Sequence, residues 1–225
     1  MRSRRRLSNA FILLACILLT ACVGSNRFLE FRHDEPSRYY LHVPATYTTN
    51  TQWSLFIALP DIRSDSDDCI EEWFEIADEN GLFLLCPELA HEGGEFDRAT
   101  NERILADILN KLYDSYSLRS RFFIAGRGAA ATFALRYAYR YPDAIEGVSA
   151  IEATAYPSEV ETVDFPILLI VGQGDDEAKQ AADVFVQSLS KTGTQARLVE
   201  VNNLGSGIPY RAQRLTVELF EQIAE

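Results

Sequence analysis

Eight short apolar or aromatic stretches run through the chain, and each is bounded by polar residues, glycine or proline, as is typical of β-strands. The first two are rich in aromatic residues and are separated by Asp34-Glu35-Pro36-Ser37, which favours a turn and predicts an antiparallel hairpin. Most of the others are continuous apolar runs, which indicates strands buried on both faces of a sheet. The predicted strands cover residues 27–33, 38–43, 53–59, 82–86, 121–125, 147–151, 166–171 and 197–201.

Five further segments carry apolar residues every three or four positions, the period of an amphipathic helix. They cover residues 70–80, 100–116, 129–140, 177–191 and 211–224. Two strands followed by alternating strands and helices predict an α/β fold, in which a mostly parallel sheet starts with an antiparallel hairpin and carries helices on both faces. One domain, residues 27–225, accounts for the whole pattern, and the short connection between residues 151 and 166 predicts no lid domain.

The first 26 residues have a different character. Four arginines among residues 2–6 precede an apolar stretch at residues 10–20 that is too short to span a bilayer comfortably. The stretch ends in Leu19-Thr20-Ala21-Cys22, which resembles the lipobox of bacterial lipoproteins. The resemblance implies a signal peptide at residues 1–21, a diacylglycerol on the Cys22 thiol, and a tether at residues 22–26. We therefore expect a lipid-anchored protein of the cell envelope, periplasmic or on the outer surface; an ordinary secretory peptide or a short anchor helix is the alternative.

Composition and charge narrow the function classes. The chain has 225 residues, 47% hydrophobic and 24% charged, which excludes wholesale disorder and fibrous proteins. The formal net charge is −12 for the full chain and −16 for residues 22–225, so bulk charge speaks against nucleic-acid binding.

Two of the four cysteines remain after Cys16 leaves with the signal peptide and Cys22 is acylated. Cys69 opens the helix that descends from the carboxyl edge of the sheet, and Cys86 ends the next strand, which returns to that edge. We expect a Cys69–Cys86 disulfide in an oxidising compartment; two buried free thiols are the alternative.

A strand, a sharp glycine turn and a helix of small residues meet at Gly126-Arg127-Gly128-Ala129-Ala130. This is the arrangement of a nucleophile elbow. Together with residues 40–44, 81–87 and 133–148, it resembles the α/β-hydrolase family, especially its polyhydroxybutyrate depolymerase-like and feruloyl esterase-like branch. The resemblance implies the α/β-hydrolase fold over most of the chain and, in the family, hydrolysis of carboxylic esters by a Ser-His-Asp triad.

The triad positions implied by the resemblance are mostly occupied by other residue types. Gly128 stands at the nucleophile position and Ser206 at the base position, and neither can perform that role. Asp175 retains the acid position, although capping the following helix explains it equally well. The oxyanion loop reads Pro60-Asp61, in which proline has no N–H to donate. Several acidic residues follow at positions 61–72, with only Arg63 nearby in sequence to oppose them.

Two function classes follow from these substitutions. In the first, the domain has lost catalysis and binds an unknown glycan, ester or protein in the former substrate cleft. In the second, it hydrolyses carboxylic esters through a non-standard nucleophile, for which Cys86, Ser149 or Ser206 is available, with His91 as the histidine nearest the expected rim. A serine or cysteine side chain within hydrogen-bond reach of His91 would favour the second class.

Other readings of the same motifs are weaker. Gly126-x-Gly128-x-x-Ala131 also fits a dinucleotide fingerprint with Glu152 as ribose ligand, but it falls in the middle of the chain. The acidic residues 65–68 lack the glycine and the distal glutamate of a calcium loop, and no His/Cys cluster has zinc spacing. We therefore expect neither a metal nor an organic cofactor.

Overall fold

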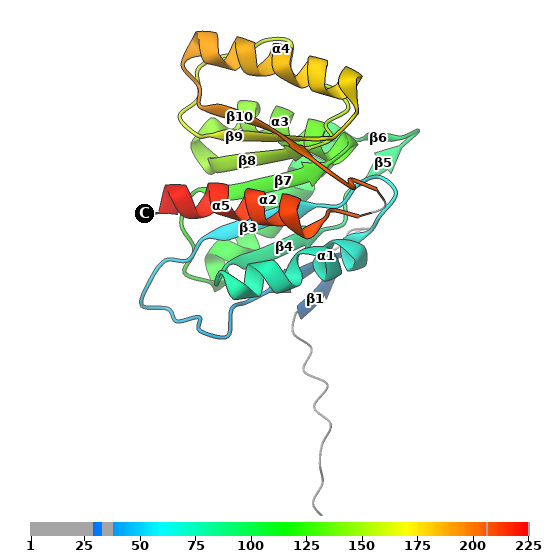
Figure 1. Cartoon of the computed structure of the whole chain (residues 1–225). Helices are drawn as coiled ribbons and strands as arrows, with labels where there is room; N and C mark the ends of the chain where they lie inside the picture. Colours follow the sequence, from blue (N-terminus) through cyan, green and yellow to red (C-terminus); the bar gives the residue numbers. More distant parts are fainter. Residues whose placement is uncertain (1–28, 33–37, 206, 225) are drawn as a thin grey trace, which may run out of the picture.

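The alternation predicted from the sequence produces one eight-stranded sheet, in the order β1-β2-β4-β3-β7-β8-β9-β10 (Figure 1). The computed structural model describes residues 29–32, 38–205 and 207–224. β2 pairs antiparallel with both β1 and β4, and every pair from β4 to β10 is parallel. The predicted fold class is therefore confirmed. The main strands are β1 (Leu29–Arg32), β2 (Arg38–His42), β3 (Leu55–Leu59), β4 (Phe83–Pro87), β7 (Phe122–Arg127), β8 (Ile145–Ile151), β9 (Ile167–Gly172) and β10 (Ala196–Val201).

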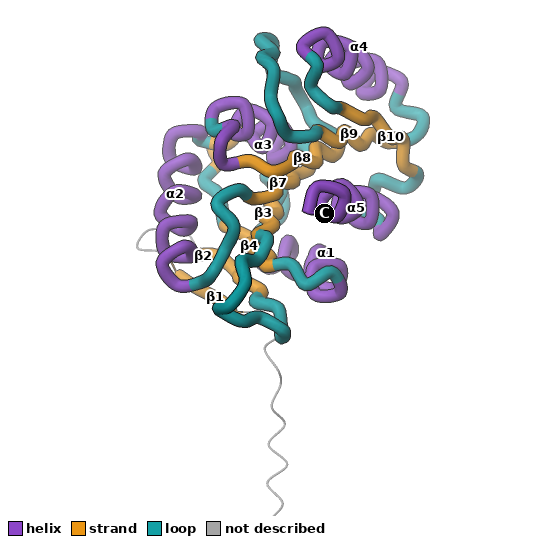
Figure 2. The backbone as a smooth tube through the Cα atoms, turned by 90° about the vertical axis from the view of Figure 1, so that its left-hand side faces the viewer, coloured by secondary structure: helices purple, strands orange, loops and turns teal. Residues whose placement is uncertain are grey.

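Helices cover both faces of the sheet, as Figure 2 shows in a view along its edge. One face carries α1 and α5, and the other carries α2, α3 and α4. No helix in the part of the chain that the structure describes is long and apolar enough to cross a membrane. The helices are α1 (Ser66–Glu79), α2 (Arg98–Ser115), α3 (Ala129–Arg140), α4 (Asp176–Thr192) and α5 (Tyr210–Ala224).

Two hydrophobic cores form because the apolar strands bury both of their faces. In β3, Leu55 and Ile57 enter the core under α2, α3 and α4, whereas Phe56 enters the core under α1 and α5. This alternation follows the two-residue period of a strand. The Phe56 ring packs against Phe220 of α5, with ring centroids 5.1 Å apart, and burial of each such aromatic ring stabilises the fold by about 1.5–3 kcal/mol.

α1 begins four residues before the start predicted from its apolar period. Asp65 is its N-cap, and its carboxylate accepts hydrogen bonds from the backbone N–H groups of Asp67 and Asp68, at 2.9 and 3.0 Å. The Asp68 carboxylate in turn accepts from the Asp65 N–H, which completes a capping box. The first turn of α1 is polar, so the hydrophobic period that marks the helix begins only at the residues that pack into the core.

The structure also contains a short hairpin that the sequence pattern did not predict. β5 (His91–Glu92) and β6 (Glu95–Phe96) form a short hairpin separate from the main sheet. Gly93 and Gly94 make its turn, both with positive φ. A Gly-Gly pair between two short segments was the available signal for such a hairpin.

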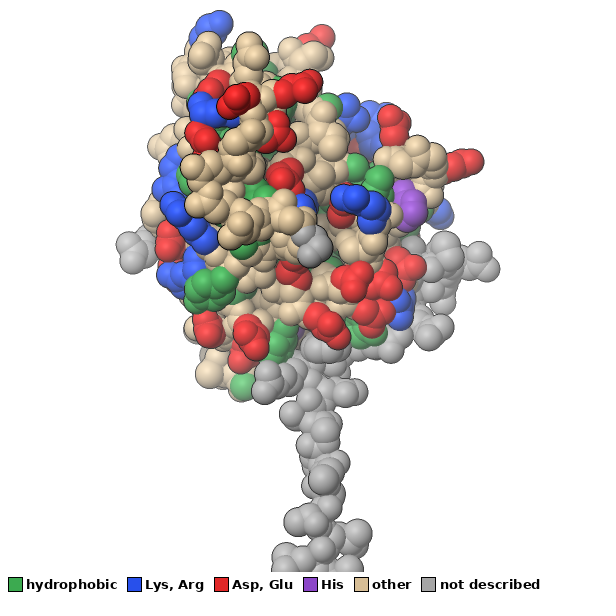
Figure 3. All heavy atoms as spheres, turned by 45° about the vertical axis from the view of Figure 1, so that its right-hand side comes forward, with side chains coloured by type: hydrophobic (Ala, Val, Ile, Leu, Met, Phe, Trp, Pro, Cys, Tyr) green, Lys and Arg blue, Asp and Glu red, His purple; other side chains and the backbone are tan. Residues whose placement is uncertain are grey.

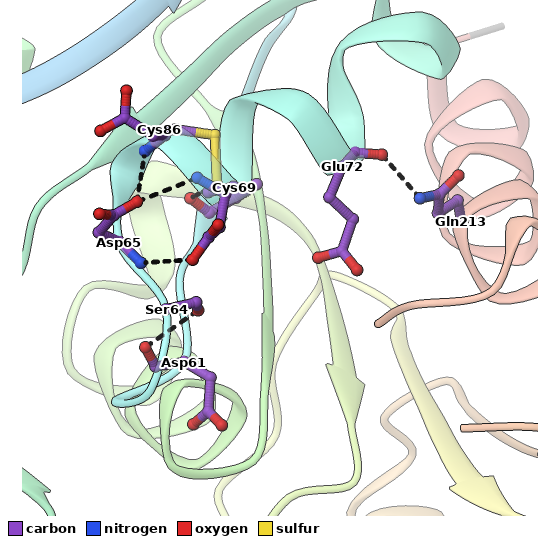
Figure 4. Close-up of a disulfide and its surroundings, with 10 residues drawn as sticks. Asp61, Ser64, Asp65, Cys69, Glu72, Cys86 and Gln213 are labelled. Carbon is purple, nitrogen blue, oxygen red and sulfur yellow. Dashed lines mark hydrogen bonds between the residues drawn. A yellow bond between two sulfur atoms is a disulfide. The ribbon is translucent and has the colours of Figure 1, made fainter. Parts of the chain in front are cut away.

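The predicted disulfide is confirmed. Cys69 of α1 and Cys86 of β4 are bonded, and their Cα atoms lie 5.9 Å apart. Both cysteines are buried, and Figure 4 shows the bridge beside the turn that follows β3. The disulfide therefore fixes the start of α1 against the sheet next to the expected oxyanion loop.

Candidate functional site

The turn between β7 and α3 has the geometry of a nucleophile elbow. Gly128 is the N-cap of α3 and has φ 60° and ψ −123°, a conformation that favours glycine. Its backbone N–H donates to the Ile151 carbonyl at 2.9 Å, which ties the turn to β8. A Cβ on Gly126 would lie 2.6 Å from the carbonyl carbon of Ala130, so only glycine lets the first turn of α3 approach the strand this closely.

The carboxylate of Asp61 lies over this elbow. A Cβ on Gly128 would lie 3.0 Å from the Asp61 Oδ1, so a side chain at position 128 would project towards that carboxylate. The backbone carbonyl of Asp61 accepts from the Ser64 N–H at 3.0 Å and from the Ser64 hydroxyl at 3.1 Å, which closes a tight turn after β3 (Figure 4). Pro60 precedes it and is buried. The structure thus places Pro60 and Asp61 beside Gly128, where the sequence analysis placed the oxyanion loop.

Acidic side chains gather on the face that carries the start of α1 (Figure 3). The expectation that only Arg63 opposes them is wrong. Arg38 reaches across from β2, and its Nη2 lies 2.5 Å from Asp67 and 3.7 Å from Asp65. The sequence could not show this neighbour because the pairing of β2 with β4 brings it there. The acidic cluster is therefore partly neutralised and serves as the cap of α1.

Arg127 and Glu152 form an ion pair that the sequence analysis did not identify. The Nε and Nη2 of Arg127 lie 2.8 and 2.7 Å from Glu152 Oε2. Nη2 also donates to the carbonyl of Gly205, at 2.5 Å. Arg127 thereby joins the elbow to the end of β8 and to the loop between β10 and α5. Glu152 has a positive φ of 50°, so its backbone is strained where the dinucleotide reading placed a ribose ligand, and its carboxylate is already engaged.

The expected acid and base positions have different surroundings. Asp175 is exposed and caps α4, and its carboxylate accepts from the Ala178 N–H at 3.0 Å. Ser206 lies outside the described residues, as does Cys22. On the far side of position 206, the Ile208 N–H donates to the Glu72 carboxylate. Burial raises the pKa of Glu72, an effect that this hydrogen bond and the nearby Arg127 oppose.

Cys86, Ser149 and His91, the described residues considered for unorthodox hydrolysis, do not meet at the rim. Cys86 is in the disulfide, and Ser149 is fully buried, with its hydroxyl 2.7 Å from the Thr216 hydroxyl. His91 is exposed on the β5–β6 hairpin and makes an edge contact with Phe96. Within residues 38–205 and 207–223, no hydrogen bond joins His91 to a serine or a cysteine.

Two cavities flank the turn that Asp61 opens. The larger, of about 670 Å³, lies towards α1 and the loop after β10, and its charged lining includes Asp61, Glu72 and Arg127. The other, of about 430 Å³, lies between this turn, the β5–β6 hairpin and α3, and Gly128 forms part of its wall. The elbow thus opens onto a cleft of a size that suits a small molecule.

Comparisons with known proteins support the fold. The sequence matches no protein-family model, and a comparison with curated proteins finds no match. The structure is similar to that of esterase PE8, with a TM-score of 0.64 and 20% identity over 84% of this chain and 97% of that one. It is also similar to FphF, a fluorophosphonate-binding serine hydrolase of Staphylococcus aureus, with a TM-score of 0.67 and 13% identity over 88% of this chain and 98% of that one.

A thermostable esterase gives a TM-score of 0.68 with 17% identity over 88% of this chain, and the chain spans 62% of the length of that esterase. Gly128 lies on the turn from β7 to α3, which has the strand–turn–helix form of a nucleophile elbow, and the Asp61 carboxylate lies beside it. The order of the strands, the elbow and these similarities together show that the chain has the α/β-hydrolase fold.

Proposed function

We propose that this protein is a non-catalytic binding protein on an α/β-hydrolase scaffold, anchored through a lipidated Cys22 to the extracytoplasmic side of a membrane. The observation that carries the proposal is the elbow itself: Gly128 holds the nucleophile's backbone conformation with no side chain, and the Asp61 carboxylate lies where that side chain would project. Acyl transfer needs a side-chain oxygen or sulfur at this point, and glycine offers none.

The electrostatics beside the elbow also oppose ester hydrolysis. An oxyanion hole requires N–H donors aimed at the developing negative charge. Pro60 has no N–H, and the Asp61 carboxylate adds negative charge at the place where a transition state would develop it. The loss of one such donor alone removes about 2.7–4 kcal/mol of transition-state stabilisation.

No histidine is found among the described residues that line the two cavities beside the elbow. The loop after β10, which carries Ser206, is held by the Arg127 guanidinium through the Gly205 carbonyl. Arginine stays protonated in proteins and therefore cannot serve as a general base. Its charge is balanced by Glu152, so Arg127 acts as a positioning residue that fixes the loop.

Extracytoplasmic placement has separate support. The Cys69–Cys86 disulfide suits an oxidising compartment, and the arginine-rich start with Cys22 after small residues suits a lipoprotein leader. An anchor of this kind would hold the cleft at a membrane surface.

The proposal is tested by initial rates on p-nitrophenyl acetate and butyrate, measured against heat-inactivated protein. We expect no turnover by wild type, Gly128→Ser or Gly128→Ala. The alanine variant is the control for Gly128→Ser, because it carries the same backbone strain without a side-chain oxygen. Gly128→Ser combined with Ser206→His would show at most feeble turnover. Robust wild-type turnover that disappears on mutation of one rim residue would overturn the proposal and favour an esterase with a non-standard nucleophile.

A further inference from the structure

We infer that the 430 Å³ cavity beside Gly128 binds an organic anion, a carboxylate on an aromatic or branched apolar body, with its charge facing Arg98 and Arg136. The inference rests on the proposed function, because it names the ligand class for the same cleft. The cavity has a partly apolar lining formed by Ile62, Phe96 and Phe133. The rings of Phe96 and Phe133 lie 5.9 Å apart and form one continuous wall.

The charged groups of the cavity are unequally distributed. Its lining holds three arginines, Arg63, Arg98 and Arg136, against two acids, Asp61 and Glu95. This local excess of positive charge runs against the net charge of −12 of the whole chain. An anion therefore binds more favourably at this positive site than on the surrounding negative surface.

The arginines at the far end of the cavity lack full partners. Glu102 is shared, because its carboxylate lies 3.3 Å from Arg140 and 3.9 Å from Arg98. No carboxylate pairs with Arg136 anywhere in the described part of the chain. The start of α2 and the middle of α3 thus present two guanidinium groups, of which Arg136 has no described carboxylate partner and Arg98 has only a long, shared one.

The two ends of the cavity are opposite in character. Ala129 and Arg136 both line it, and seven residues of helix separate them by about 10 Å along the axis. Asp61 stands at the Ala129 end, beside Gly128, and the exposed Arg63 guanidinium, 3.6 Å from its carboxylate, offsets only part of its charge. An elongated ligand is therefore oriented, with its carboxylate repelled by Asp61 and attracted to Arg98 and Arg136, and its apolar body against Phe96 and Phe133.

The hydroxyl groups of the cavity are already engaged, which disfavours a neutral sugar as the ligand. The Thr132 hydroxyl lies 3.0 Å from the Thr154 hydroxyl and accepts from the Ala155 N–H at 3.0 Å. These bonds leave charge and apolar contact as the main means of recognition at this site.

Calorimetric titration of the full chain in a neutral detergent, with phenylbutyrate as the probe, tests the inference. We expect saturable one-to-one binding, with affinity lowered about two- to fivefold by Arg136→Gln and by Arg98→Gln, as for ion pairs of exposed side chains. The neutral amide of the probe should bind correspondingly weakly, and Asp61→Asn should strengthen binding of phenylbutyrate. Arg197→Gln is the matched control, because Arg197 is an exposed arginine on β10 that lines a different cavity.

Absence of saturable binding by wild type would overturn the inference. Equal affinity for the amide, or an Arg136→Gln variant that binds like Arg197→Gln, would overturn it as well. Thermal melts of each variant separate lost binding from lost folding. The proposed function is tested separately. Turnover of p-nitrophenyl esters would overturn it, whether or not phenylbutyrate binds.

Discussion

Replacement of Gly128 by alanine tests whether the elbow is a strained turn that now accommodates only glycine. At φ 60° and ψ −123°, a residue with a Cβ is strained by about 1–3 kcal/mol. The new Cβ would also lie 3.0 Å from the Asp61 Oδ1, but that atom ends a flexible side chain that can turn aside. We therefore expect backbone strain to dominate, with a fall in melting temperature of about 2–12 °C for a domain of this size.

Alanine substitutions at two other glycines should be less and more destabilising than Gly128→Ala. Gly193 has φ 83° at the end of α4 with nothing within 4 Å of a Cβ, so Gly193→Ala costs only the left-handed strain of about 1 kcal/mol. At Gly126 the Cβ would meet the Ala130 backbone at 2.6 Å, which cannot move without displacing α3. Gly126→Ala should be the least stable of the three.

Chemical denaturation with matched m-values gives the three free energies of unfolding. The predicted order of destabilisation is Gly193→Ala, then Gly128→Ala, then Gly126→Ala. Adding Asp61→Ala to Gly128→Ala should restore little stability, because the carboxylate is not the main obstacle. A Gly128→Ala variant as stable as wild type, or one fully rescued by Asp61→Ala, would refute the reasoning.

Three further predictions follow from the disulfide, Glu72 and the anchor. Replacing Cys69 and Cys86 together by alanine removes a cross-link that closes a loop with a sequence separation of 17, and should lower stability by about 3 kcal/mol in the chain-entropy model. Reductant should then no longer change the melting temperature of this variant; an effect equal to that on wild type would contradict the prediction. Because burial raises the pKa of Glu72 in the folded state, its stabilising contribution is present at low pH and lost as pH rises through that pKa. Melting curves from pH 4 to 8 should therefore show the melting temperature of wild type falling relative to that of Glu72→Gln as pH rises. A wild type that instead gains stability relative to the variant over this range would contradict the prediction. Detergent phase partitioning of wild type and Cys22→Ser should differ, with wild type in the detergent phase; partitioning of both into the aqueous phase would exclude lipidation.

Much of this architecture could be predicted because its signals are local. Continuous apolar runs gave the buried strands, and the Gly126-x-Gly128 turn after one of them gave the elbow. The disulfide followed from topology, since a helix start and a strand end meet at one edge of a parallel sheet.

The features missed depend on contacts between distant segments. Arg38 neutralises the acidic start of α1 only because β2 pairs with β4, and Arg127 reaches both Glu152 and Gly205 only after the sheet has formed. α1 starts before the position that its hydrophobic period predicts because Asp65 caps a polar first turn that carries no such period.

Labelling of the purified protein with a fluorophosphonate probe, followed by peptide mapping, tests the central claim most directly. The probe reacts with a serine only where a base and an oxyanion site activate it. Gly128 supplies no oxygen and Asp61 opposes the charge that would develop, so we predict no labelling of wild type above that of heat-denatured protein. Stoichiometric, heat-sensitive labelling of any serine would contradict the account and identify the nucleophile of an active hydrolase.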